Sequence, residues 1–371
     1  MRDSGNISAR IEILRFPLIA GVVFIHSYNS TITMAQGSLG AAHSSAWADF
    51  VRFFLSQGVA RAAVPLFFLI SGYLFFLGEW SWGNYLGKLK RRVGTLLIPF
   101  LFWNLTALAI YSAGRCLPQT RIYFAGGAWP PAGPFSIFGY LGALFGVTTR
   151  QPLCYPFWFI RDLMVLVLLA FAIHFLIRIK WALPFLIALS GLWFASAWFA
   201  AAWPFLWPSV EAAFFFSLGA HLAQPGRNVN CLDNLGPWNG AVFLGLLILN
   251  SAYPDGPLYL RRCAIVFGVP SLWWLTGLAA RSAKIKSTLI SLSGASFFVF
   301  AAHEPLLMIL RKLCYKLLSP SGGAEILALY FLIPFCMMAF LVITHRYLLK
   351  IMPRFIGLIT GSGFRTKQQR G

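Results

Sequence analysis

The stretch ILRFPLIAGVVFIHS at residues 13–27 is apolar enough to enter a lipid bilayer, yet it carries Arg15 near one end and His26 near the other. Eleven residues make about three turns of an α-helix, so both side chains would lie on one face, ~16 Å apart along the axis. A charge at the bilayer centre costs at least ~2.5–3.5 kcal/mol, so that face should avoid lipid. Either Arg15 reaches anionic head groups while His26 donates an interhelical hydrogen bond, or the two are functional groups.

The composition of the whole chain agrees with a membrane location. Its 371 residues are 58% hydrophobic and 11% charged, and the mean hydropathy is +0.72. A soluble domain carries about twice that charge. The net charge of +20 comes from short basic clusters between apolar blocks, which fits cytoplasmic loops and anionic lipid head groups rather than nucleic acid.

The apolar blocks predict an all-α integral membrane protein with about ten transmembrane helices. They lie at 13–31, 53–77, 94–112, 156–177, 183–203, 208–223, 239–253, 261–280, 289–310 and 326–348. An even number of spans puts both termini on one side, and most of the 30 basic residues fall on that side, so we expect an N-in, C-in orientation. The block at 135–147 is too short to span and is expected to be re-entrant or interfacial.

The domain organisation is expected to be simple, with one transmembrane domain at 1–350 and a cytoplasmic basic tail at 351–371. The Gly- and Pro-rich segment at 113–152 is predicted to be a long external loop. Cys116 falls in it and Cys154 follows just after it, so the two could share the loop, and we expect unpaired thiols rather than a disulfide between them. The six cysteines show no CxxC spacing, so no metal site is predicted.

Several other ionisable residues lie within apolar blocks. Pro305 should break the predicted ninth span beside His303 and Glu304, and broken helices at membrane depth are tolerated where they line a cavity. Arg161 and Asp162 point about 100° apart on a helix, so we expect each to pair with another helix rather than with its neighbour.

Two further features have alternative roles. Glu211 is expected to bind a hydroxyl, to pair with a cation or to cap its helix beside Ser209. The small pair Ser71-Gly72 is expected to let two helices approach closely.

Five ordered motifs resemble the acyltransferase 3 family of integral membrane enzymes that O-acylate surface sugars. They are R-x10-H at Arg15 and His26, FFLISGYLFF at 67–76, FWFIRDLMVL at 157–166, FFFSLGAHLA at 214–223 and SFFVFAAHEPLL at 296–307. The resemblance extends from about residue 10 to residue 350.

This resemblance implies an acyl-CoA donor used from the cytoplasm and an acceptor presented from outside, with Arg15 and His26 as the family's arginine and histidine. The family's RxxR element corresponds to KLKRRVGTLL at 88–97, where a lysine replaces the first arginine. Lys88, Arg91 and Arg92 are therefore expected to bind the phosphates of CoA, although an ordinary positive-inside anchor explains the same cluster.

The predicted catalytic residues are His26, Arg15 and Asp162. His26 would be the general base that takes a proton from a sugar hydroxyl, or a transient acyl carrier. Asp162 would orient His26 or bind acceptor hydroxyls. The predicted substrate-binding residues are Arg161, Glu211, His303 and Glu304.

We therefore predict a multi-pass O-acetyltransferase of the inner (plasma) membrane. It would use acetyl-CoA or a longer acyl-CoA and a surface or lipid-linked glycan, contact membrane lipids, and need no bound cofactor. The alternative is a secondary transporter or flippase, a class that often shows inverted repeats, and the sequence contains no such repeat.

Overall fold

The computed structural model describes residues 2–34, 37–40, 45–124, 136–147, 151–178, 181–199, 208–234 and 236–364, and they are almost entirely helical. Every one of the ten apolar blocks lies largely in a helix or in a broken pair of helices. Within the described residues, four helices are long and apolar enough to cross a membrane, and up to six if each bent pair is one span. An all-α membrane protein is confirmed at this level.

The chain divides into two compact units, and the first comprises residues 1–22, 58–93 and 159–296. It contains the first part of α1 (Arg2–Ser27). Its other elements are η2 (Val59–Ala62), α3 (Ala63–Phe76), α4 (Trp82–Arg92), α8 (Trp158–Leu168), α9 (Ala170–Arg178), α10 (Ala182–Phe199), α11 (Val210–Leu222), η5 (Val229–Asp233), α12 (Gly236–Ala252), α13 (Leu258–Ala279) and α14 (Ala283–Ser293).

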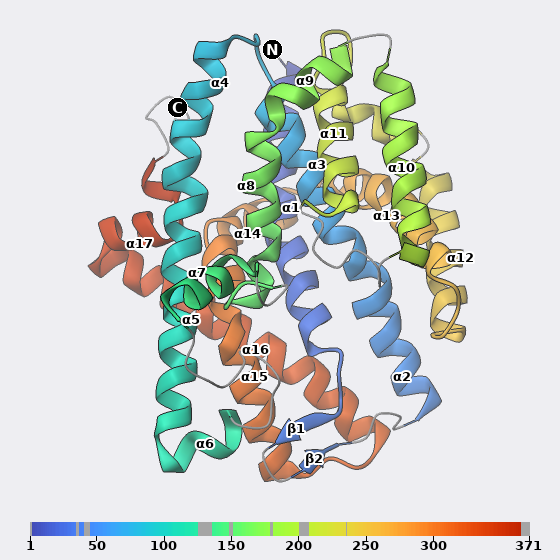
Figure 1. The fold of residues 1–371 in the computed structure, drawn as a ribbon. Helices are drawn as coiled ribbons and strands as arrows, with labels where there is room; N and C mark the ends of the chain where they lie inside the picture. The colour runs from blue at the N-terminus through green and yellow to red at the C-terminus, as the bar shows by residue number, and fades with distance from the viewer. Residues whose placement is uncertain are drawn as a thin grey trace. The chain divides into compact units, whose positions relative to one another are not determined.

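Within the first unit, α3 and α11 run side by side with their backbones almost touching (Figure 1). A Cβ atom on Gly72 would lie 2.0 Å from the carbonyl oxygen of Phe216, and one on Gly219 would lie 1.9 Å from that of Leu69. Neither position has room for a side chain. The expectation that the small pair at 71–72 permits close helix packing is confirmed.

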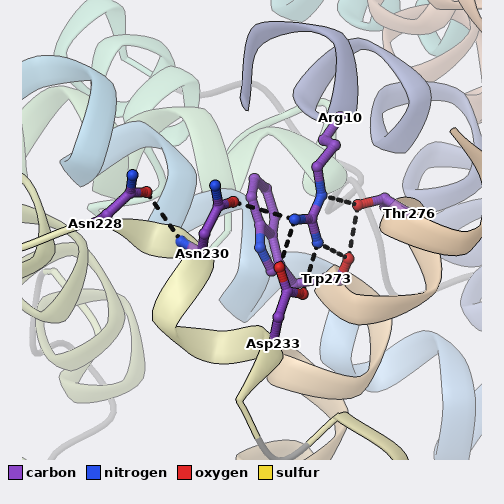
Figure 2. A network of polar contacts seen from close by, with 6 residues as sticks. All are labelled: Arg10, Asn228, Asn230, Asp233, Trp273 and Thr276. Atoms are coloured by element: carbon purple, nitrogen blue, oxygen red, sulfur yellow. Dashed lines mark hydrogen bonds and ion pairs between the residues drawn. The ribbon is translucent and has the colours of Figure 1, made fainter. Parts of the chain in front are cut away.

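Arg10 ties three elements of the first unit together (Figure 2). Its Nη1 and Nη2 atoms donate to Asp233 Oδ2 and Oδ1 at 2.5 and 2.8 Å, and Nη1 also donates to Asn230 Oδ1. Nε donates to Thr276 Oγ1, and Nη2 donates to the Trp273 carbonyl oxygen. The guanidinium therefore joins α1, η5 and α13, and its contacts identify it as structural.

The second unit comprises residues 23–57, 94–158 and 297–371. It contains the end of α1 and most of α15 (Ser296–Leu318). Its other elements are β1 (Ile32–Met34), β2 (Gly37–Leu39), α2 (Ala46–Phe53), η1 (Phe54–Gly58), η3 (Val93–Leu97), α5 (Ile98–Cys116), α6 (Pro118–Phe124), α7 (Ile137–Phe145), η4 (Tyr155–Phe157), α16 (Gly323–Ile351), α17 (Pro353–Ile359) and η6 (Ser362–Phe364).

The strands β1 and β2 form a small antiparallel hairpin in which Ile32 pairs with Leu39 (Figure 1). The end of α1 is fixed by Ser56, whose Oγ donates to the Phe24 carbonyl oxygen at 2.6 Å and lies 2.7 Å from Tyr330 Oη. The hydroxyl thus links α1 to η1 and α16 just before His26.

The helix break predicted at Pro305 is confirmed, because Glu304 has φ −111° and ψ 134° inside α15. Within the predicted short block at 135–147, α7 runs from Ile137 to Phe145 and is capped by Ser136 and Gly146. All six cysteines are free. Cys116, which is exposed, and Cys154, which is buried, are thus unpaired thiols, as expected for these two. Parts of the predicted external loop, at 125–135 and 148–150, and the tail from 365 onward lie outside the described residues.

Candidate functional site

His26 occupies the last turn of α1 and contacts Tyr155 in the second unit. Its Nδ1 lies 3.0 Å from Tyr155 Oη, and the two rings meet edge to face with centroids 4.9 Å apart. Tyr155 in turn donates to Glu304 Oε1 at 3.0 Å. Residues from α1, η4 and α15 thus form one hydrogen-bonded chain.

The direction of these hydrogen bonds determines which nitrogen of His26 is basic. A tyrosine hydroxyl has one O–H group and can donate one hydrogen bond, and Tyr155 donates it to the Glu304 carboxylate. The Tyr155 oxygen must then accept from His26 Nδ1–H. In the neutral imidazole the lone pair is therefore on Nε2, as in enzymes whose histidine is oriented by a carboxylate.

The segment before α8 holds Tyr155 in place. The Cys154 N–H donates to Asn104 Oδ1 at 2.8 Å, and Asn104 is fully buried on α5. Phe157 is also fully buried, and its ring packs against Phe100 and Phe300 with centroids 6.0 and 5.3 Å away. The tyrosine is thus presented on a fixed turn between α5 and α15.

His303 is a second imidazole in this cluster, with its ring centroid 5.3 Å from that of His26. Its Nδ1–H donates to the Phe300 carbonyl oxygen, which leaves the lone pair on Nε2. This side chain is completely buried, and Nε2 has no hydrogen-bond partner among the described residues. An unpaired buried acceptor is costly, so a donor from a substrate would satisfy it.

Arg311 completes the cluster from the far part of α15. Its Nη1 donates to the His26 carbonyl oxygen at 2.9 Å, where the last carbonyls of α1 lack helical partners. Its Nη2 and Glu304 Oε2 are both buried with no hydrogen-bond partner in the described part of the chain. The His26 cluster, made of His26, Tyr155, His303, Glu304 and Arg311, therefore has unused acceptors and an unused donor.

Asp162 and Arg161 lie in the first unit and form an ion pair with each other. Arg161 Nη2 and Nε donate to Asp162 Oδ1 at 3.0 and 3.2 Å. The expectation that neighbours on a helix would not pair is wrong, because the long arginine side chain folds back onto the shorter aspartate. Asp162 Oδ2 also accepts from the backbone N–H of Ser209, so this carboxylate holds the start of α11.

Glu211 also lies in the first unit, in the first turn of α11. Ser209 caps this helix by accepting from the Ala212 N–H, so the capping role expected for Glu211 belongs to Ser209. Glu211 Oε2 accepts from Trp193 Nε1 at 3.1 Å, and the charges of Arg61 and Arg262 act on it. Glu211 thus interacts with polar and charged side chains of the first unit: Trp193, Arg61 and Arg262.

The model of the acyltransferase 3 family, described as an acyltransferase domain, matches residues 8–346. The chain belongs to the acyltransferase 3 family. This acyltransferase is 29% identical over 377 residues to the succinoglycan biosynthesis protein ExoH of Rhizobium meliloti (strain 1021), across 96% of this chain and 93% of ExoH. No solved structure matches it.

Arg15 lies on the same continuous helix of the acyltransferase as His26, eleven residues earlier, as the sequence predicts. Its side chain is half-buried in the first unit. Both residues of the predicted R-x10-H motif are thus carried by α1.

Lys88 of the acyltransferase donates hydrogen bonds to the end of α3. Its Nζ donates to the carbonyl oxygens of Phe75 and Leu77 at 2.6 and 3.1 Å. Arg92 stacks over the Phe75 ring at 6.0 Å, whereas Arg91 is exposed on α4. Lys88 therefore caps a helix C-terminus, and Arg91 is the most accessible cation of the predicted phosphate cluster.

Sequence reasoning missed two members of the His26 cluster. Tyr155 is an aromatic residue at the start of a predicted span, where such residues commonly anchor helices at the membrane interface. Arg311 lies one residue past the predicted block 289–310, but it is seven residues after Glu304, a spacing that usually returns to the same helix face. That spacing was the signal available for Arg311.

Proposed function

We propose that this acyltransferase is a multi-pass O-acyltransferase of the inner membrane that moves an acyl group from cytoplasmic acyl-CoA to a hydroxyl of a surface or lipid-linked glycan. The observation that carries the proposal is the hydrogen-bonded chain from His26 through Tyr155 to Glu304. Membership of the family supports acyl transfer, and the polysaccharide context in the name of ExoH supports a glycan acceptor. A transporter function has no comparable support.

In the proposed reaction, His26 Nε2 takes the proton of the acceptor hydroxyl as that oxygen attacks the thioester carbonyl carbon. A carbon–oxygen ester bond forms, the carbon–sulfur bond breaks, and the CoA thiolate leaves and takes the proton from the His26 imidazolium, which regenerates the base. The imidazolium is stabilised because Nδ1–H donates to Tyr155, whose hydroxyl donates to the Glu304 carboxylate. The unpartnered His303 Nε2 would accept from a sugar hydroxyl.

A transient acyl carrier is the alternative role for the same nitrogen. His26 Nε2 would attack the thioester carbonyl carbon, the carbon–sulfur bond would break, and the CoA thiolate would leave. A sugar hydroxyl would then attack the acyl-imidazole, the acyl–nitrogen bond would break, and the hydroxyl proton would pass to the released imidazole. Mass spectrometry of enzyme quenched with acyl-CoA in the absence of acceptor distinguishes the two routes. Acyl-His26 would establish the carrier route, and its absence during rapid transfer would favour the base.

The membrane arrangement that we propose has ten spans with both termini in the cytoplasm. It places Arg91 and Arg92 on the cytoplasmic side, where they would bind the phosphates of acyl-CoA while Lys88 fixes α4 to α3. Arg15 would help to guide the acyl arm. For Asp162 we propose a supporting role, because both of its oxygens already accept hydrogen bonds from Arg161 and Ser209.

The test is transfer of radiolabelled acyl groups from acyl-CoA to lipid-linked oligosaccharide extracted from the native host, using the purified full-length protein. Wild-type protein should transfer label, and the His26→Ala and Arg15→Ala variants should not. Absence of transfer by folded wild-type protein with each of several acyl-CoA donors would refute the proposal.

A further inference from the structure

Lys312 on α15 is a buried lysine of the second unit that has no carboxylate partner among the described residues. The residue is 6% exposed. Its Nζ donates one hydrogen bond, to the Tyr123 carbonyl oxygen on α6 at 2.6 Å. An ammonium group has three donors, and a lysine is almost never this buried without an opposite charge beside it. Within the described part of the chain, two donors of Lys312 are therefore unused.

Two further cations lie at the same end of α6, where it meets the end of α15 (Figure 1). Lys316 Nζ lies 5.3 Å from the centroid of the Tyr123 ring, and Arg115 Nε on α5 donates to the Phe124 carbonyl oxygen at 3.4 Å. The C-terminus of a helix carries roughly half a negative charge, so it balances only a small part of three positive charges. We call Lys312, Lys316 and Arg115 the basic cluster.

The second unit contains three acidic residues, and their partners lie elsewhere. Asp49 forms an ion pair with Arg52 at 2.5 Å. Glu304 accepts a hydrogen bond from Tyr155, and Glu325 accepts from two backbone N–H groups just before α16. The two lysines of the basic cluster therefore have no carboxylate partner among the described residues. Like charges held close together repel each other unless an anion lies between them.

The proposed topology puts the basic cluster on the external side. The predicted span 94–112 ends before Arg115, and the predicted span 289–310 ends before Lys312. Arg121 adds a further exposed cation on α6. External segments next to spans are normally poor in lysine and arginine, because these residues collect on the cytoplasmic side. A positive-inside anchor thus does not explain the basic cluster, and its charge indicates an anionic ligand.

Phosphate is the anion that fits this position. Cations from α5 and α15 can each contact a different oxygen of one phosphate group, and lysine binds phosphate as a point charge. At the outer surface of a membrane, phosphate groups are carried by phospholipids and by lipid-linked glycans. Lys312 directly follows Arg311, which donates to the His26 carbonyl oxygen, so the basic cluster adjoins the His26 cluster on α15.

We propose that the basic cluster binds a phosphate group on the external side, carried either by a lipid-linked acceptor glycan or by an anionic phospholipid. A lipid-linked acceptor with its phosphate at Lys312 has its first sugars beside the His26 cluster, because the two clusters are adjacent. The first source of the phosphate rests on the proposed function, and the second source does not.

Binding of lipids to the purified full-length protein in detergent tests the proposal without any acyl transfer. The phosphate probes are polyprenyl diphosphate and dioleoylphosphatidylglycerol. Their controls are polyprenol and dioleoylglycerol, which keep the same chains but lack the phosphate. Microscale thermophoresis gives the four dissociation constants. Wild-type protein should bind at least one phosphate probe about tenfold more tightly than its control, which is the size of one hydrogen bond to a charged group.

Three variants locate the binding on the protein. Lys312→Met keeps the length of the side chain without its charge and should lower the preference for the phosphate probe about tenfold. Lys316→Gln removes an exposed charge and should lower the preference about threefold. Lys316 makes no hydrogen bond within the described residues, so this variant tests the site even if Lys312→Met fails to fold. Lys350→Gln is the matched control, because it removes one exposed charge from the far end of α16 and should keep the wild-type preference.

The outcomes separate the two sources of phosphate. A preference for polyprenyl diphosphate that the lysine variants of the basic cluster weaken supports a lipid-linked acceptor, and the same result with phosphatidylglycerol supports a phospholipid. Equal binding of the probes and their controls overturns the site, as does a preference that both variants keep or that Lys350→Gln weakens equally. Absence of acyl transfer by wild-type protein would refute the proposed function, and the binding result would still decide the site.

Discussion

The histidine at the end of α1 has a defined basic nitrogen because of its neighbours. The Tyr155 hydroxyl can donate only one hydrogen bond, and the Glu304 carboxylate accepts it. His26 Nδ1–H must therefore be the donor in the hydrogen bond between His26 and Tyr155. Because Nδ1 carries the proton, the basic lone pair of the imidazole is on Nε2. The reactivity of one residue thus depends on a hydroxyl and a carboxylate from two distant parts of the sequence.

Removing the Tyr155 hydroxyl tests this dependence. In Tyr155→Phe the ring stays in place but His26 loses the acceptor for Nδ1–H, and we expect acyl transfer to fall roughly 10- to 100-fold, the size of a charge-assisted hydrogen bond. The measurement is the initial rate with labelled acyl-CoA. Tyr111→Phe is the control, because it removes the same hydroxyl from a buried tyrosine that makes a weak hydrogen bond to Met308 Sδ at 3.8 Å rather than one to His26. Equal rates in both variants would contradict the role of Tyr155.

At the residue scale, the sequence predicted those members of the His26 cluster that are ionisable side chains within apolar blocks. His26, His303 and Glu304 stand out for that reason, and the structure brings the three together. Tyr155 could not be predicted in this way, because nothing in the local pattern separates it from an aromatic anchor. Its role depends on Asn104, which fixes the preceding residue from about fifty positions away in the chain.

At the scale of single elements, the apolar blocks predicted the helices well because long hydrophobic segments must satisfy their backbone hydrogen bonds internally. The details of α8 and α9, which are bent by 62° relative to each other, were not predictable. The short helix α6 within the predicted external loop was also missed, since its polar sequence resembles a loop.

The close packing of α3 and α11 leads to a stability prediction. Gly72→Ala and Gly219→Ala would push a methyl group into a backbone carbonyl of the facing helix, and we expect a loss of about 1–3 kcal/mol in unfolding free energy. The apparent melting temperature in detergent measures the effect. Gly191→Ala on α10, where nothing lies within 4 Å, should be neutral or stabilising. Equal melting temperatures for all three variants would contradict the packing.

The hydrogen bonds that Arg10 makes to η5 and α13 lead to a second prediction for the first unit. Arg10→Lys keeps the charge but replaces a fork of five donors by three, so α1, η5 and α13 lose shared hydrogen bonds. We expect unfolding free energy to fall by about 1–3 kcal/mol. The control is Arg281→Lys at an exposed position. A melting temperature for Arg10→Lys as high as that of the control would show that the Arg10 hydrogen bonds do not stabilise the first unit.

At the scale of the whole molecule, the proposed ten-span topology predicts the sidedness of the cysteines. Cys116 should face the outside and Cys231 the cytoplasm, and both are exposed and free. In single-cysteine variants in intact cells, a membrane-impermeant maleimide should label Cys116 at once and Cys231 only after permeabilisation. Labelling of both from the same side would refute an arrangement with an odd number of spans between them.

The central claim is that Tyr155 and Glu304 act on the reaction only through His26. A double-mutant cycle measures this most directly, using initial rates of acyl transfer by wild type, Tyr155→Phe, Glu304→Gln and the double variant. We predict that each single variant is slow and that the double variant is no slower than the worse single one, because either change breaks the same hydrogen-bonded chain. Losses that multiply, or a single variant with the wild-type rate, would contradict the account.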